Sequence, residues 1–319
     1  MMELAGSKPL RMSRFFFIVL FSLCFFGCHR KEGDFQPQLN YAVQDTYLKQ
    51  LPSPFPPLSE LERHEDWGRE YTVGIGFARQ LDLYQAMTAF KRAEILAPKT
   101  DTQRLQELRY DVVLCYYLGQ KYREVTYEFE KGALRHIDTD FPAFHDLLVI
   151  LYDCYLKLNE EERAAALLET IRYYYPDTAA RLQTSTALMK ANFSVLKGQE
   201  ELKEFLTAYE TEKKSPGKAR TLNTFLPGAG YLYLGQYQSA LTAAILNGLF
   251  IAATYHFFDH GQIAAGTIFL SFEFGWYFGG IFGAGLEAKS YNERLYERLA
   301  TPMMNQNRLF PILNLRYGF

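Results

Sequence analysis

The chain of 319 residues carries a net charge of −2, and 48% of its residues are hydrophobic. Aromatic side chains are abundant, with 26 phenylalanines and 23 tyrosines. Because there is no basic excess, nucleic acid is excluded as the predicted partner, and the composition favours one soluble region accompanied by membrane segments.

Residues 1–28 have the three-part form of a secretory signal. Three basic residues precede the apolar run Phe15–Phe26, and Cys28 follows directly after a glycine. A small residue before a cysteine resembles a bacterial lipobox, although the two phenylalanines ahead of the glycine depart from that motif. The resemblance implies a lipoprotein of the bacterial cell envelope with lipid attached at Cys28; an uncleaved signal anchor is the alternative. Residues 29–66 are polar and then proline-rich, which predicts a semi-extended tether.

One register then repeats at a spacing of 39 residues, with starts at Trp67, Gln106 and His145. Position 11 of each copy is a large aromatic residue, position 20 is small or β-branched, and position 24 is bulky. These residues are Phe77, Tyr116 and Tyr155, then Ala86, Val125 and Ala164, and finally Phe90, Phe129 and Leu168. Residues at these spacings share one face of each of two helices, so the fixed period predicts stacked helical hairpins, which generally bind partners rather than catalyse.

The first copy resembles the tetratricopeptide pattern of small, aromatic and proline residues. The matching residues are Gly74, Phe77, Ala86, Phe90, Ala93 and Pro98. Each copy carries about five residues more than the usual period of about 34. The resemblance covers residues 67–215, including a degenerate fourth copy from Thr184 with helical segments Ala187–Leu196 and Gln199–Tyr209. It implies an all-helical right-handed stack whose concave groove receives a peptide or a partner helix.

The groove of such a stack is the predicted functional site. Many tyrosines follow the predicted helices, and most of them are interpreted as core because stripes at helical spacing are usually core. Tyrosine is also favoured in protein contacts, so we predict that Arg109, Tyr110, Tyr117 and Tyr152 line the groove.

No catalytic motif is present in the sequence, and we predict neither enzymatic activity nor a cofactor or metal. The best local candidates for metal ligands are interpreted as helix caps between copies. They are His136, Asp138, Asp140, His145 and Asp146. Cys115 and Cys154 occupy the same slot in neighbouring copies, about 8–10 Å apart, which predicts two buried free thiols rather than a disulfide.

Residues 216–300 form a predicted membrane module. Two apolar runs, Tyr237–Phe258 and Gln262–Gly283, are each long enough to cross about 30 Å of hydrocarbon, and three residues join them into an antiparallel hairpin. An amphipathic helix is predicted to follow. Small residues recur every four positions on each helix, which predicts close contact within the hairpin or between copies in a homo-oligomer. They include Gly248 on the first helix and Gly275, Gly279 and Gly283 on the second.

The segment Leu226–Gly235 precedes these runs and carries three glycines and a proline. It is similar to the Pro-Gly-x-Gly element that begins the two-helix hairpins of several uncharacterised bacterial membrane families. The later run Trp276–Asn292 looks like the close of the same module. This resemblance covers residues 221–299 and implies a membrane domain with no known activity.

Three polar residues lie inside the predicted membrane module, namely Asn247, His256 and Glu273. A carboxylate at mid-membrane depth is costly and usually faces protein or water. Glu273 is therefore interpreted either as a packing residue that contacts Asn247 or as a proton-relay residue. His256 lies four residues before His260, a spacing that suits zinc, but two histidines at a hairpin turn are interpreted as interfacial polar residues.

The orientation of the module is contested within the sequence. An export signal places both ends of the hairpin outside the cytoplasm, whereas the basic residues that flank it place them inside. We prefer the signal, because the flanks also carry glutamates, and we predict periplasmic repeats. In residues 301–319, apolar and polar residues alternate from Leu309 to Phe319, which predicts either a short strand that pairs with a partner or a disordered tail.

The sequence thus predicts an all-α protein, a tetratricopeptide-like helical-hairpin solenoid followed by a two-helix transmembrane hairpin. Its predicted function is that of a membrane-anchored scaffold, which binds a protein or peptide in the repeat groove and membrane lipids through the hairpin. The alternative is an accessory subunit of a transport or protein-insertion machinery that acts through the hairpin.

Overall fold

The computed structural model describes residues 35, 37–39, 45–132, 134, 135 and 137–319. The predicted signal, Cys28 with its predicted lipid, and His136 lie outside this part of the chain. Within it, all regular secondary structure is helical, as the sequence predicted. The chain divides into two compact units. We call them the tail-binding unit, Leu39–Gln199 with Ala300–Phe319, and the glycine-rich unit, Glu200–Leu299 with the described residues up to Gln38.

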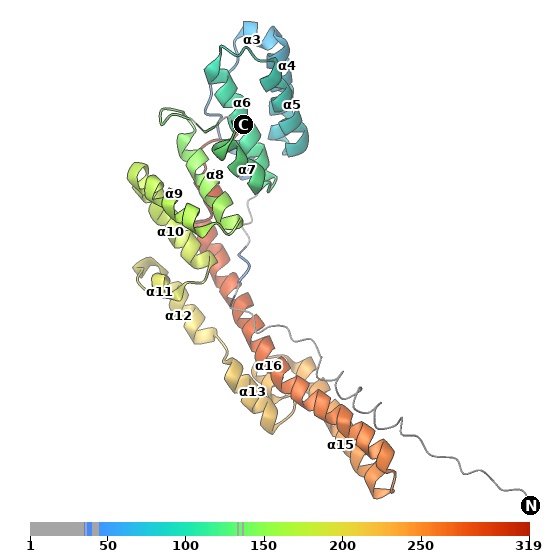
Figure 1. Ribbon diagram of the computed structural model, residues 1–319. Helices are drawn as coiled ribbons and strands as arrows, with labels where there is room; N and C mark the ends of the chain where they lie inside the picture. Colours follow the sequence, from blue (N-terminus) through green and yellow to red (C-terminus); the bar gives the residue numbers. More distant parts are fainter. Residues whose placement is uncertain (1–34, 36, 40–44, 133, 136) are drawn as a thin grey trace, which may run out of the picture. The chain divides into compact units, whose positions relative to one another are not determined.

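In the tail-binding unit, each helix from α3 to α11 contacts the next one along the chain, as Figure 1 shows. The helices are α2 (Asp45–Gln50), α3 (Glu60–His64), α4 (Asp66–Arg79), α5 (Leu83–Leu96), α6 (Thr102–Leu118), α7 (Tyr122–Glu130), α8 (Phe144–Lys157), α9 (Glu161–Tyr174), α10 (Pro176–Met189), α11 (Phe193–Leu196) and the 3-10 helix η2 (Pro311–Asn314). Contacts between α6 and α8 add a link between successive pairs.

One type of turn connects the first and second helices of each pair. A residue with positive φ follows the first helix at Leu81 (63°), Gln120 (58°) and Asn159 (60°), at the predicted spacing of 39 residues. The next residue in each case donates its N–H to the carbonyl of the position-11 aromatic residue, at 2.8–3.0 Å. The same turn follows α10 at Ala191 (48°) and interrupts the helix expected at Ala187–Leu196. The fourth pair therefore begins earlier than the predicted register from Thr184.

Small residues allow the first two helices of the stack to approach closely. Ala86 and Phe90 of α5 are fully buried. A Cβ atom added at Gly74 of α4 would lie only 2.6 Å from the Phe90 ring. The match to small and aromatic positions in the first copy therefore has a direct steric cause, because any larger residue at position 74 would push α4 away from α5.

The glycine-rich unit contains two long helices and several short ones. Its elements are η1 (Glu200–Leu202), α12 (Lys203–Glu212), α13 (Pro216–Phe225), α14 (Ala229–Tyr233), α15 (Tyr237–Asp259) and α16 (Ile263–Gln306), whose last residues from Ala300 belong to the tail-binding unit. The predicted helix 237–258 matches α15, whereas the predicted helix 262–283 is only the first half of α16. Among the described helices, α15 alone is long and apolar enough to cross a membrane.

The Pro-Gly-x-Gly segment forms a tight corner between α13 and α15. Asn223 of α13 is 2% exposed, and its Oδ1 accepts the N–H groups of Gly228 at 2.8 Å and Gly230 at 3.3 Å. Gly228 has a φ of 95°, which disfavours any residue with a side chain. A Cβ at Gly228 would collide with the carbonyl oxygen of Ala240, and one at Gly230 with that of Ala219. The motif thus lets three backbone segments touch.

We expect Gly230→Ala to destabilise the glycine-rich unit by about 1–3 kcal/mol, because the added methyl group has no space beside α13 and α16. Gly248→Ala is the matched control, since a Cβ there meets nothing within 4 Å. Thermal unfolding of the full chain in detergent should show a lower transition for the first variant only. Equal transitions would contradict the steric explanation of the motif.

Candidate peptide-binding site

The carboxyl-terminal segment that follows α16 packs along the tail-binding unit. The 3-10 helix η2 contacts α8 and α10. The apolar residues of this tail are almost fully buried, namely Leu309, Phe310, Ile312, Leu315 and Phe319. The predicted strand is wrong, because residues 309–319 form η2 with non-helical backbone on either side of it and no ladder. The apolar side chains of residues 309–319 are buried against helices instead of a sheet edge.

A buried carboxylate holds the tail. Asp146 lies in the first turn of α8 and is 0% exposed. Its Oδ2 accepts the backbone N–H groups of Arg316 at 2.8 Å and Tyr317 at 2.9 Å. Its Oδ1 lies 2.7 Å from Nδ1 of His145, whose Nε2 lies 3.0 Å from Thr178 Oγ1 on α10. Asp146 therefore binds the main chain of the tail and requires no particular side chain at the two residues that it holds.

Further contacts fix the path of the tail on both sides of Asp146. The hydroxyl group of Tyr47 on α2 donates to the carbonyl groups of Leu313 and Leu315, at 3.2 Å each. Gly318 donates its N–H to the carbonyl of Pro52 at 3.0 Å. The Phe319 ring stacks on Phe90 of α5, with the ring centroids 6.1 Å apart. The tail thus runs from α10 and α8 toward the first helix pair.

The predicted groove-lining tyrosines are core residues. Tyr110, Tyr117 and Tyr152 are 0%, 5% and 2% exposed, so no external partner can reach them in this structure. The prediction fails because the three rings fill the core, and the hydroxyl groups of two of them link the first helices of neighbouring pairs. Tyr117 of α6 donates to Asp153 of α8 at 2.8 Å, and the Tyr152 hydroxyl lies 2.7 Å from Thr186 Oγ1 on α10.

Tyr110 and Arg109 complete the set of predicted groove residues. The Tyr110 ring lies edge-on to Phe55 of the proline-rich segment, with the centroids 5.5 Å apart. Burial raises the pKa of the Tyr110 phenol well above its ordinary value. Arg109 is half-buried and donates from Nε to Glu94 Oε1 at 3.0 Å. These residues stabilise the stack, and none of the four forms an open binding surface.

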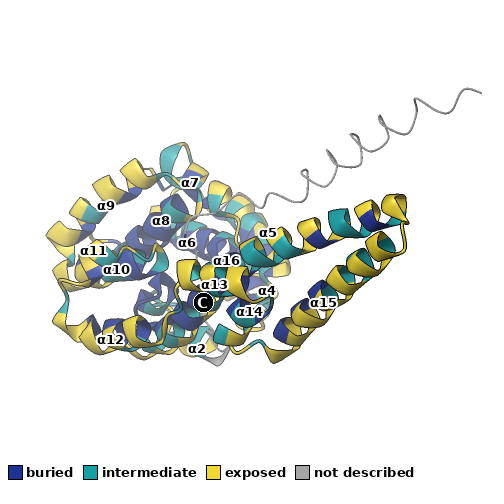
Figure 2. Ribbon diagram, turned by 90° about the horizontal axis from the view of Figure 1, so that it is seen from below, coloured by how far each residue is buried: buried dark blue, intermediate teal, exposed yellow. Residues whose placement is uncertain are grey.

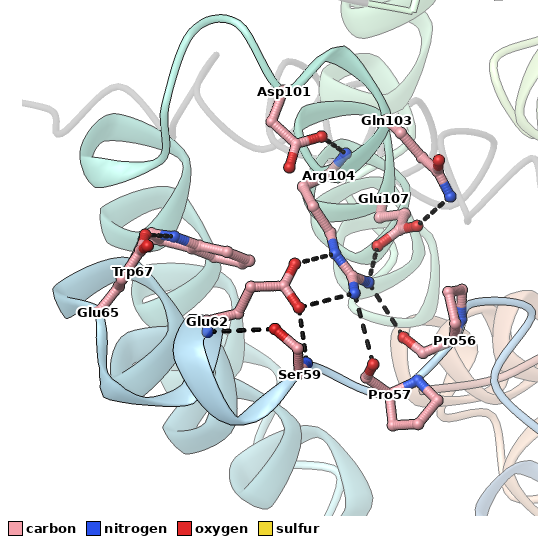
Figure 3. A network of polar contacts seen from close by, with 10 residues as sticks. All are labelled: Pro56, Pro57, Ser59, Glu62, Glu65, Trp67, Asp101, Gln103, Arg104 and Glu107. Carbon is pink, nitrogen blue, oxygen red and sulfur yellow. Dashed lines mark hydrogen bonds and ion pairs between the residues drawn. The ribbon is translucent and has the colours of Figure 1, made fainter.

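Arg104 fixes the proline-rich segment against α6, as Figure 3 shows. Its Nε donates to Glu62 Oε1 at 2.8 Å, and its Nη1 donates to Glu107 Oε2 at 2.6 Å and to the Pro56 carbonyl at 3.0 Å. Ser59 and Glu62 form a capping box at the start of α3. The sequence predicted a tether here, but this part of residues 29–66 is a packed wall of the tail-binding unit.

Asn247 and Glu273, which were predicted to pack together, form no hydrogen bond with each other. Asn247 is 3% exposed, and its Nδ2 donates to the Ala243 carbonyl at 2.6 Å. Asn247 Oδ1 and Glu273 Oε2 are buried and lack a hydrogen-bond partner among the described residues. His260 Nδ1 lies 2.9 Å from the His256 carbonyl, and the two rings contact each other. His256 is thus part of a local turn contact.

The predicted packing glycines divide into two groups. A Cβ added at Gly248, Gly275 or Gly279 would meet no atom within 4 Å, so these residues make no close helix contact in the described chain. A Cβ at Gly283 would lie 2.5 Å from the Tyr231 hydroxyl, so Gly283 is required by the α14 corner. None of the four glycines therefore makes the predicted close contact between α15 and α16, and Gly283 contacts α14 instead.

Cys115 and Cys154 are buried free thiols, as predicted, and burial raises the pKa of each thiol. Nowhere in the described part of the chain do three His, Cys, Asp or Glu side chains gather as metal ligands. No protein-family model matches the chain, and no match is found among the curated proteins or the solved structures. The candidate peptide-binding site is therefore described from the contacts and burial of its own residues.

The ion pair of Glu62 predicts a specific pH dependence. Hydrogen bonds from Arg104 lower the pKa of Glu62 from 4.5 to about 2, so the folded state favours the charged carboxylate. Its stabilisation is present above pH 4.5 and is lost as the pH falls toward 2. We therefore expect Glu62→Gln to lower the free energy of unfolding at neutral pH, with a difference from the unaltered chain that shrinks over this interval. Glu60→Gln, at an exposed pair with a 3.7 Å separation, should show little effect.

Asp146→Ala should release the tail while leaving the helical stack folded. Two partly buried N–H groups lose a charged acceptor, and hydrogen bonds to charged groups contribute about 1.5–3 kcal/mol. Hydrogen exchange at the amides of Arg316 and Tyr317 should accelerate accordingly. Asp177→Ala is the control, because Asp177 is an exposed acid in the first turn of α10. Equal exchange in both variants would show that Asp146 does not hold the tail.

Proposed function

We propose that this protein is a membrane-anchored scaffold whose helical stack binds an extended segment of a partner protein. The observation that carries the proposal is the bound tail, which the stack holds through main-chain hydrogen bonds to Asp146. The recurrence of one turn at Leu81, Gln120 and Asn159 supports a tetratricopeptide-like solenoid. In such a stack, a surface that already accommodates one extended segment suits peptide recognition.

Exposed apolar side chains support insertion of α15 and the first half of α16 into a membrane. Many of these side chains are more than 50% exposed, as the exposed faces of α15 in Figure 2 illustrate. They include Leu241, Ile245, Leu249, Ile251, Phe272, Phe274, Phe278 and Phe282. A soluble protein rarely exposes so large an apolar patch, whereas hydrocarbon would cover it at no cost. A transmembrane hairpin is the arrangement that we propose.

Basic and aromatic residues gather near the α13–α14 corner. This corner lies at the opposite end of α15 from the turn that joins α15 to α16. The Lys214 and Lys218 ammonium groups lie 5.0 and 5.1 Å from the centre of the Tyr233 ring. The Arg220 guanidinium lies 6.0 Å from the centre of the Phe282 ring. Such pairs are typical of the boundary between lipid and water. They support contact with a membrane surface, whereas the predicted signal and Cys28 of the sequence are the grounds for the bacterial cell envelope with periplasmic repeats.

The second candidate function is that of an accessory subunit in membrane transport or protein insertion. The buried and unpartnered oxygen atoms of Asn247 and Glu273 favour it, because such polar atoms within an apolar hairpin are costly unless they serve a partner, a proton or water. The scaffold does not require Glu273, whereas the accessory function does.

Photo-crosslinking in intact cells separates the two functions. We expect a benzoyl-phenylalanine at Thr72, an exposed residue on α4, to yield a discrete protein adduct. The same group at Ala165, an exposed residue on α9, should yield none, and Glu273→Gln should leave the Thr72 adduct unchanged. Absence of the adduct, or equal adducts from both positions, would contradict the scaffold. Loss of the adduct in Glu273→Gln would favour the accessory function.

A further inference from the structure

An open groove continues from the point where the bound tail ends. It lies in the tail-binding unit between the proline-rich segment and α4, and its volume is about 760 Å³. Phe319 contributes to one end, while Phe55, Tyr71 and Ile75 provide apolar lining. Pro56 and Pro57 belong to the opposite wall, which Arg104 holds in place through hydrogen bonds to their carbonyl groups. The groove is therefore preformed rather than created by a ligand.

Three arginines give this groove a positive edge, namely Arg63, Arg69 and Arg79. Arg63 and Arg69 approach Glu60 and Asp66 only to 3.7 Å, in exposed pairs within single helical turns. Such exposed ion pairs contribute little to stability, so either arginine can leave its acid to bind a ligand carboxylate. Arg79 forms no ion pair with any residue that the structure describes.

The other acidic groups around the groove are already engaged. Glu62 and Glu107 bind Arg104, and Glu70 pairs with Arg92 at 2.6 Å. Asp111 is 1% exposed, and burial raises its pKa well above the ordinary value, which disfavours the charged form. None of these four acids neutralises the three arginines, so the positive edge is available to an external ligand.

The spacing of the arginines defines the shape of the ligand. Arg69 and Arg79 are ten residues apart on α4, which corresponds to about 15 Å along the helix axis. An extended peptide covers that length with about five residues. The apolar side chains Tyr71 and Ile75 lie between the two positions in sequence. A chain with separated carboxylates suits this spacing, because it can place one carboxylate at each arginine.

We propose that this groove binds an extended acidic segment of another protein, with two carboxylates about five residues apart and an apolar side chain between them. The inference rests on the proposed scaffold function and specifies the chemistry of its partner. Arg69 and Arg79 hold the two carboxylates, and the lining formed by Phe55, Tyr71 and Ile75 receives the apolar side chain. The segment lies next to Phe319, beside the end of the protein's own tail.

Selection from a random dodecapeptide phage library on the purified full chain in detergent tests this proposal. We expect the enriched peptides to be acidic with an interspersed apolar residue, and Arg69→Glu combined with Arg79→Glu to weaken their binding more than about tenfold. Arg123→Glu is the matched control, because Arg123 is exposed on α7 outside the groove. Circular dichroism of each variant checks that the fold is retained, and Arg69→Gln with Arg79→Gln provides a milder substitution.

Three outcomes would overturn the proposal. The first is that the enriched peptides carry no acidic pattern, and the second is that the arginine substitutions leave peptide binding unchanged. The third is that dihexanoyl phosphatidylglycerol binds the groove while no peptide is enriched, which would assign the groove to a lipid headgroup. The Thr72 adduct distinguishes these failures from failure of the scaffold function. If that adduct forms but acidic peptides do not bind, the scaffold function is retained and the proposed acidic partner is rejected.

Discussion

The position of the tail on the tail-binding unit depends on one buried carboxylate that accepts hydrogen bonds from main-chain groups. Asp146 receives the N–H groups of Arg316 and Tyr317 and contacts His145, so both of its oxygen atoms are engaged. A fully buried acid without such partners would be strongly destabilising. The chain therefore uses the carboxylate to define where the tail lies, and the apolar side chains of the tail then cover α8 and α10. Recognition of backbone groups is also the form of binding that an external segment could use.

The glycine-rich unit depends on a different constraint, the closeness of its backbone segments. Gly228 and Gly230 allow α14 to touch both α13 and the start of α15, and Asn223 satisfies their N–H groups. Gly283 serves the same corner against Tyr231. The corner anchors α15 and α16 at one end, while their remaining surfaces are apolar and exposed. This combination explains why the unit needs glycine in some positions, and the exposed apolar surfaces support the proposed insertion into a membrane.

The two ends of the proposed binding surface differ in chemistry. Around Asp146, the tail covers the helices and the tyrosines are buried, so this end is occupied by the chain itself. Beside Phe319 the surface opens, and Arg69 and Arg79 provide charge that no acid of the described chain fully neutralises. An acidic segment bound there would meet a rigid wall, because Arg104 links Pro56 and Pro57 to α6. The arginine that organises the wall is thus distinct from those proposed to contact the partner.

The sequence by itself determined the helical class, the recurring turn at 39-residue spacing and the need for small residues at Gly74 and Ala86. These features arise from interactions between residues close in the chain, where periodicity and side-chain size are decisive. The tertiary structure alone decided that Tyr110, Tyr117 and Tyr152 are core, and that the alternating residues of the tail pack against helices. Tyr317 and Asp146 are 171 residues apart in the sequence, and no local pattern specifies which buried acid accepts which backbone group. The open groove has the same origin, because it forms only when a proline-rich segment, α4 and Phe319 come together in the folded unit.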